Sequence, residues 1–106
     1  MPGSGAATLD FGVFPGASDT SLAISGQAAI VPGSLVEAWL LPGVTADHST
    51  DEHIVDPPRI VAANISSGVG FTIYGTARDG PDGNFANKNA NTGLVYGQWS
   101  VAWVWN

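Results

Sequence analysis

Cysteine is absent from this chain of 106 residues, and basic residues are scarce. Without cysteine neither a disulfide framework nor a thiolate metal site can form, so a small domain must be held together by packing or by partners. Three Lys and Arg residues against nine Asp and Glu residues give a formal net charge of −6, and a negative protein is repelled by the phosphate backbone of nucleic acids. We therefore expect no nucleic-acid partner.

Long apolar runs and straight-chain helix formers are also missing. The longest apolar stretches end at Pro32, Glu37 or Pro42, far short of the roughly 18–20 residues that span a bilayer, so we expect no membrane association. The first five residues lack the basic start and apolar stretch of a signal peptide, which predicts a protein made and kept in the cytoplasm or in an assembly formed there. Lys, Arg, Glu, Gln and Met together supply eight residues against 14 Gly and 7 Pro, which excludes a helical bundle or coiled coil.

The chain does contain short apolar stretches separated by turn residues at intervals of about ten, a spacing typical of all-β domains. We predict one antiparallel β-sandwich over residues 9–106, of jelly-roll or immunoglobulin-like type, with a small β-barrel as the alternative. Residues 1–8 are small and polar, and we expect them to form a flexible N-terminal arm. The predicted strands cover residues 9–14, 21–27, 35–41, 59–65, 71–75 and 94–105.

Two stretches between these strands are irregular. Residues 44–58 are predicted to form a loop with one helical turn, because Ser49 and Glu52 fit a capping box ahead of a double proline. The Asn-rich stretch 78–92 is predicted to be an exposed loop. Within the strand 35–41, which is otherwise apolar on both faces and so predicted to be central, Glu37 fits structural pairing with Arg59 or an exposed edge position better than a general acid.

The last strand carries a row of tryptophans. Trp99, Val101, Trp103 and Trp105 share one face because alternate residues of a strand point the same way. One interpretation is that these rings simply form the core. The other is that Trp103 and Trp105 anchor to a neighbouring subunit, as tryptophans at interfaces often do. On this second interpretation the contact residues are Tyr96, Trp99, Trp103 and Trp105, together with the arm at residues 1–8.

Residues 47–53 gather two imidazoles and three carboxylates, which are ligand types for zinc or manganese. The candidate ligands are His48, His53 and Asp51, but the two histidines are five residues apart and no third histidine exists in the chain. A solvated acidic loop explains the cluster better, and we expect no cofactor. A metal could still bind at a site shared between copies of the chain at a symmetry axis.

The chain also lacks the Gly-x-Ser-x-Gly motif of a nucleophile elbow, so we expect no enzymatic activity. A metal-dependent hydrolase is the least favoured hypothesis.

Several stretches are similar to those of a known group. The C-terminal stretch Tyr96–Asn106 and residues 14–18, 34–39, 46–53 and 70–74 resemble short, mostly uncharacterised proteins encoded by tailed bacteriophages and prophages of proteobacteria. The resemblance implies a small all-β virion component: a head decoration (cement) protein, or part of the tail or neck. It implies a place in the virion, with partners that are further copies in a symmetric homo-oligomer and the major capsid protein or other virion proteins. No catalytic or ligand residue can be carried over from it.

Two classes of function therefore stand. The first is a non-enzymatic structural component that stabilises a phage particle by subunit packing, with head decoration as the first choice. The alternative is an adhesion module of the tail, neck or tail fibre that binds carbohydrate through exposed aromatic rings. The exposure of the tryptophan face discriminates between them, because a carbohydrate platform needs two or more rings open to solvent.

Overall fold

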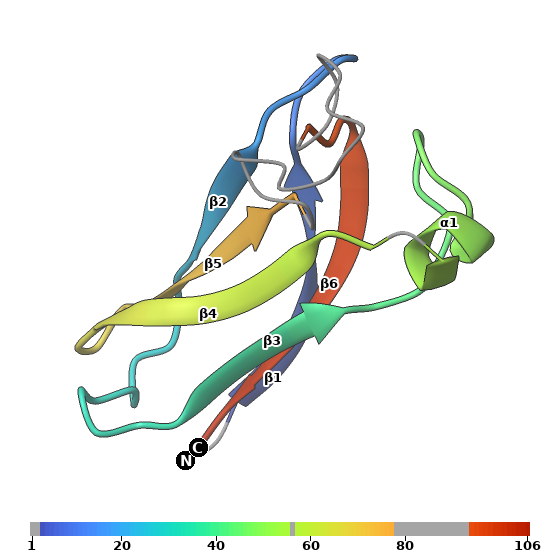
Figure 1. The fold of residues 1–106 in the computed structure, drawn as a ribbon. Coiled ribbons are helices and arrows are strands. Elements are labelled where there is room, and N and C mark those ends of the chain that lie inside the picture. The colour runs from blue at the N-terminus through green and yellow to red at the C-terminus, as the bar shows by residue number, and fades with distance from the viewer. Residues whose placement is uncertain (1–2, 56, 78–93) are drawn as a thin grey trace.

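The computed structural model describes residues 3–55, 57–77 and 94–106, and the regular structure in this part of the chain is mostly β-strand, with one short helix (Figure 1). Its elements are β1 (Gly3–Asp10), β2 (Asp19–Ile24), β3 (Val36–Leu40), α1 (Thr50–Val55), β4 (Arg59–Ser66), β5 (Gly70–Thr76) and β6 (Gln98–Trp105). The predicted loop at 78–92 lies outside the described residues. No helix in the described part is long and apolar enough to cross a membrane.

The described strands form two antiparallel sheets. Sheet I has the strand order β1-β6-β3, and sheet II has the order β2-β5-β4. Among the described residues no backbone ladder joins one sheet to the other, although β3 and β4 run close together along one side (Figure 1). The prediction of a small β-sandwich is confirmed, and the alternative of a closed barrel is wrong. The finer assignment to a jelly-roll or immunoglobulin-like topology stays a prediction.

The tryptophans of β6 fill the space between the sheets because their neighbours in sheet I are small. Trp103 pairs with Gly5 on β1 and with Ala38 on β3, and Trp105 pairs with Gly3 and Val36. A Cβ atom on Gly5 would stand 2.5 Å from Cζ2 of Trp103, so the indole lies directly over the glycine backbone. Buried side chains of both sheets and of the loops that follow β1 and β2 complete this core: Leu9, Phe11, Ile30, Phe71, Ile73 and Val101.

The expectation of a flexible arm over residues 1–8 is wrong for residues 3–8, while residues 1 and 2 lie outside the described part of the chain. Residues 3–8 instead form most of β1, which pairs along its whole length with β6. Their small side chains indicated an unstructured segment when taken alone, but they are the residues that a row of large rings requires opposite it. In the sequence this signal is the pair of tryptophans at 103 and 105, whose partners at 5 and 3 are glycines, within a stretch 3–8 in which every residue is small.

Other boundaries differ more modestly from the prediction. The strand predicted over 9–14 ends at Asp10, and Val13 and Phe14 are exposed in the following turn. The strand predicted over 94–105 begins at Gln98, while Val95 forms an isolated bridge with Ala17. The hairpin of β4 and β5 is confirmed, with a bulge between Ala63 and Ser66.

The prediction of a central strand at 35–41 is wrong. Among the strands of the described residues, β3 lies at an edge of sheet I and pairs with β6 alone, and its apolar residues divide between two faces. Ala38 is buried, whereas Trp39 is 43% exposed on the opposite face. A run of apolar residues on both faces therefore marks a strand with an outward apolar surface here, not one covered on two sides.

Candidate functional site

The segment 45–53, where the sequence concentrates its histidines and carboxylates, covers one end of β6. The last residue of β3 in the ladder, Leu40, pairs with Val101, and the N–H of Leu41 still donates to the carbonyl of Ser100. Beyond this point β3 no longer borders β6 on that side. The backbone groups of Tyr96, Gln98 and Ser100 would be left without partners if nothing replaced the strand.

Side chains take the place of the missing strand. The Thr45 hydroxyl donates to the carbonyl of Gln98 at 2.8 Å, and the N–H of Gln98 donates to Oδ2 of Asp47 at 2.8 Å. The N–H of Ser100 donates to Nε2 of His53 at 3.0 Å. These three bonds continue the ladder of β6 with side-chain partners, so the segment protects a sheet edge.

The helical turn that carries His53 begins with the predicted capping box. The N–H of Ser49 donates to Oε1 of Glu52 at 2.8 Å, and the N–H of Glu52 donates to the Ser49 hydroxyl at 3.2 Å. The same Glu52 carboxylate lies 3.2 Å from Nδ1 of His48. The backbone bond from Ser49, followed by the bond with His48, lowers the pKa of Glu52 below its ordinary value of 4.5. The capping-box prediction is confirmed.

His48 is buried between aromatic rings. Its imidazole stacks on Trp99 with ring centroids 3.9 Å apart and planes at 27°, and it lies 4.7 Å from the Tyr96 ring. Nε2 of His48 donates to the carbonyl of Tyr96 at 2.6 Å. His48 therefore fixes the chain just before β6 and covers one face of Trp99.

The predicted metal ligands do not converge on one point. Both ring nitrogens of His48 face protein oxygens, and His53 bonds the Ser49 carbonyl through Nδ1 and the Ser100 N–H through Nε2. Asp51 is exposed at the start of α1. Within residues 3–55, 57–77 and 94–106, no three His, Asp or Glu side chains stand close enough to hold a metal ion. The arrangement gives both histidines a structural role in the single chain.

The predicted interface residues lie mainly in the core. Trp99, Trp103 and Trp105 are 4%, 7% and 4% exposed, so the core interpretation holds for this row and the interface interpretation is wrong for these three rings. Tyr96 is half-buried, with its ring 5.3 Å from that of Phe14. The row also offers no platform of rings to a sugar, which removes the basis of the carbohydrate hypothesis at this face.

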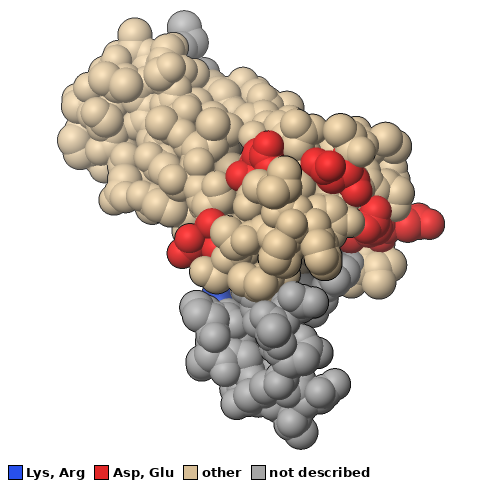
Figure 2. Space-filling model, turned by 90° about the horizontal axis from the view of Figure 1, so that it is seen from above, with Lys and Arg blue, Asp and Glu red and all other residues tan. Residues whose placement is uncertain are grey.

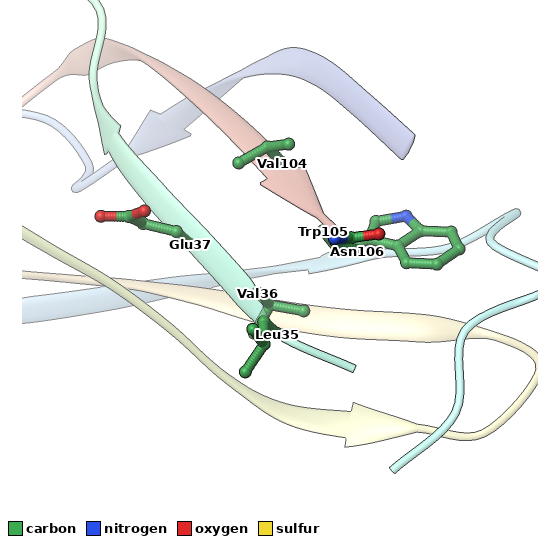
Figure 3. A pocket seen from close by; sticks show the side chains of 6 residues that line it. All are labelled: Leu35, Val36, Glu37, Val104, Trp105 and Asn106. Atoms are coloured by element: carbon green, nitrogen blue, oxygen red, sulfur yellow. The ribbon is translucent and has the colours of Figure 1, made fainter. Parts of the chain in front are cut away.

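A shallow hollow of about 370 Å³ lies between the start of β3 and the end of β6 (Figure 3). Its lining includes one titratable side chain, that of Glu37, whose carboxylate extends away from the apolar side chains around it (Figure 3). Glu37 is exposed at the edge of sheet I, and no ion pair joins it to Arg59, which begins β4 in sheet II. The exposed edge position expected for Glu37 is confirmed, and the pairing with Arg59 is wrong.

The outward face of sheet I is the feature that the sequence reading missed. The register aligns Ala6, Ala102 and Trp39 in one row across the three strands. The row on one side consists of Ser4, Val104 and Glu37. The row on the other side consists of Thr8 and Ser100, with Leu41 next to Ser100. Alternation within β3 could have found this face, because Glu37, Trp39 and Leu41 share a side opposite Val36, Ala38 and Leu40.

Charge is distributed unevenly over the molecule. Several acidic side chains lie on the face drawn in Figure 2, which views the molecule from above relative to Figure 1, while much of the visible surface is uncharged. Asp10, Asp19, Asp47, Asp51 and Glu52 are all exposed. On the outward face of sheet I, in contrast, the carboxylates of the described residues lie at the margins, at Glu37 and Asp10.

Comparison with known proteins adds no assignment. No family model, no curated protein and no solved structure matches this chain.

Proposed function

We propose that this protein is a non-enzymatic structural component of a bacteriophage particle, with head decoration as the first choice, which stabilises the assembly by packing against copies of itself or against shell proteins. Placement in a phage particle rests on the resemblance of residues 14–18, 34–39, 46–53, 70–74 and 96–106 to phage-encoded proteins. The packing mode rests on a separate observation, the outward face of sheet I.

That face has the chemistry of a packing surface. Trp39 is 43% exposed beside the small side chains of Ala102 and Ala6, so one large ring stands next to a flat, shallow row. Indole rings contribute strongly to interfaces because they remove a large apolar area from water with few rotatable bonds. None of the described residues on this face is Lys or Arg, so its burial leaves no basic group among them without a partner.

The experiment is a binding assay with a matched pair of variants. Trp39→Ser removes the ring from sheet I, and Val61→Ser removes a side chain of similar exposure, 51%, from sheet II. The wild-type protein is expected to form a concentration-dependent oligomer in light scattering, or to co-sediment with phage heads stripped of it. Trp39→Ser is expected to weaken that association by about tenfold or more, as loss of an interface hot spot does, and Val61→Ser to leave it unchanged.

Either of two results would contradict the packing proposal, and a third would favour the alternative function. A wild-type protein that stays monomeric at every concentration and does not bind heads would remove the packing function. Equal effects of the two variants would show that the face of sheet I is not the contact. Specific binding of the monomer to a polysaccharide, lost in Trp39→Ser, would move the tail or neck adhesion module from alternative to first choice.

A further inference from the structure

We infer that His53 is a proton-sensitive lock, which holds the segment 45–53 on β6 while its imidazole is neutral and releases the segment when the imidazole takes up a second proton. This inference is independent of the proposed packing function. It rests on the identity of the two atoms that face the ring nitrogens of His53.

The two partners of His53 fix one protonation state. Nδ1 lies 2.8 Å from the carbonyl oxygen of Ser49, which can only accept, so Nδ1 carries a hydrogen. Nε2 lies 3.0 Å from the backbone nitrogen of Ser100, which can only donate, so Nε2 must offer its lone pair. The neutral Nδ1–H tautomer satisfies both bonds. A proton on Nε2 would face the N–H of Ser100 and destroy the bond.

Burial makes this conflict costly. His53 is 1% exposed, so a protonated ring could not turn to water without moving α1 away from β6. Its ring lies 4.9 Å from that of Trp99 on one side and 6.5 Å from that of His48 on another. Opening of the segment is therefore the route by which His53 can accept the second proton.

The charged groups around His53 are not placed to stabilise its protonated ring within the closed segment. On α1, the Glu52 carboxylate is engaged by Ser49 and His48, and Asp51 is exposed. In the preceding loop, Asp47 accepts from the backbone of Gln98. From the sheets, β6 presents the Ser100 N–H and the Trp99 ring, and Arg59 at the start of β4 is exposed.

His48 has the opposite requirement and supplies the control. Its Nε2 faces the Tyr96 carbonyl and its Nδ1 faces the Glu52 carboxylate, so both nitrogens can carry hydrogens without losing a bond. A second proton on His48 is compatible with the closed segment, whereas one on His53 is not. The two histidines of one segment thus differ in whether the closed segment accommodates a ring with hydrogens on both nitrogens.

The direction of the effect follows from proton linkage. The open state binds one proton more than the closed state, so opening is favoured as the pH falls. The equilibrium constant for opening rises by at most about tenfold per pH unit, the limit for one proton, and an unconstrained imidazole takes up its proton near pH 6.5. Release of the segment would uncover Trp99 and free the backbone groups of Gln98 and Ser100 for pairing with another strand.

The test combines imidazole NMR with amide hydrogen exchange between pH 7.5 and pH 5. At pH 7.5 the His53 signals should report the neutral Nδ1–H tautomer. After correction for intrinsic exchange rates, opening at the Ser100 amide should increase by about tenfold or more across the range, while the Ile73 amide in the centre of sheet II should change much less. In His53→Gln, whose amide oxygen can still accept from Ser100 but cannot titrate, the increase should vanish. In His48→Gln it should persist.

The inference is overturned if His53 is charged, or hydrogenated at Nε2, at pH 7.5. It is also overturned if Ser100 opening is independent of pH, or if Ile73 opens in step with Ser100, since the chain then unfolds as a whole. An unchanged response in His53→Gln would count equally against it. Should His53→Gln fail to fold, the wild-type tautomer and the comparison of Ser100 with Ile73 decide the question.

Discussion

Replacement of Gly5 by alanine tests the packing of β1 on the tryptophan row. The added Cβ would stand 2.5 Å from Cζ2 and 2.9 Å from Cε2 of Trp103, distances that no relaxed contact adopts. The Trp103 ring cannot simply move aside, because it is 7% exposed and packs edge-on against Phe71 with centroids 5.4 Å apart. We expect Gly5→Ala to lower the free energy of unfolding by about 1–3 kcal/mol, the usual cost of overpacking.

This cost opposes a gain that alanine ordinarily brings. Alanine in place of glycine within a strand should stabilise by roughly 0.5–1 kcal/mol through the entropy of the unfolded chain, so a net loss is itself informative. Gly33→Ala is the matched control, because nothing lies within 4 Å of its added Cβ and its backbone suits alanine. Urea unfolding at 25 °C gives the free energies, and thermal melts should shift by roughly 4–8 °C per kcal/mol in a domain of this size.

A second substitution separates the clash from other effects on β1. In a Trp103→Leu background the ring that meets the new Cβ is gone, so the penalty of Gly5→Ala should shrink to near zero or reverse sign. The reasoning is refuted if Gly5→Ala is as stable as the wild type, or if its penalty is the same with and without the Trp103 ring. Either result would mean that residues 3–8 are not held against β6 as the register places them.

Two further predictions concern the helical turn and the core. Glu52→Gln should lower the melting temperature above pH 4.5, because Glu52 has a lowered pKa and stabilises the fold only while it is charged. The melting temperatures of the variant and the wild type should converge as the pH falls below 4.5. A difference in melting temperature that stays constant from pH 6 to pH 3 would contradict the stabilising role of the charged Glu52 side chain. Ile73→Ala should cost about 2–5 kcal/mol in urea unfolding, since Ile73 is 0% exposed between the sheets; a cost below about 1 kcal/mol would place Ile73 outside the core.

Much of the architecture was accessible from local pattern. Alternation in residues 99–105 correctly placed three tryptophans on one face, and turn residues separated most of the strands. The capping box of Ser49 and Glu52 was readable because both partners lie within one helical turn. These features depend on neighbours in the sequence, so no knowledge of strand order was needed to predict them.

The candidate site was less accessible because its partners are distant in the chain. The histidines and carboxylates of 45–53 indicated a metal or an acidic loop, and nothing local reveals that Asp47 and His53 bond the backbone of Gln98 and Ser100 about 50 residues later. The outward apolar face was missed for a similar reason. Whether Trp39 faces a core or solvent depends on the edge position of β3, which is a property of the sheet.

The sequence by itself determined the class of the fold and the composition of the chain. The chain is acidic, cysteine-free and Gly-rich, and its alternating strands can bury one row of tryptophans. Only the tertiary structure decided that residues 3–8 form a strand, that β3 is an edge, and that the histidines close the ladder of β6. The physical reason is that side-chain alternation is a local property, fixed by strand geometry every second residue. Pairing partners, edges and burial depend on contacts between segments far apart in the chain, which one sequence does not specify.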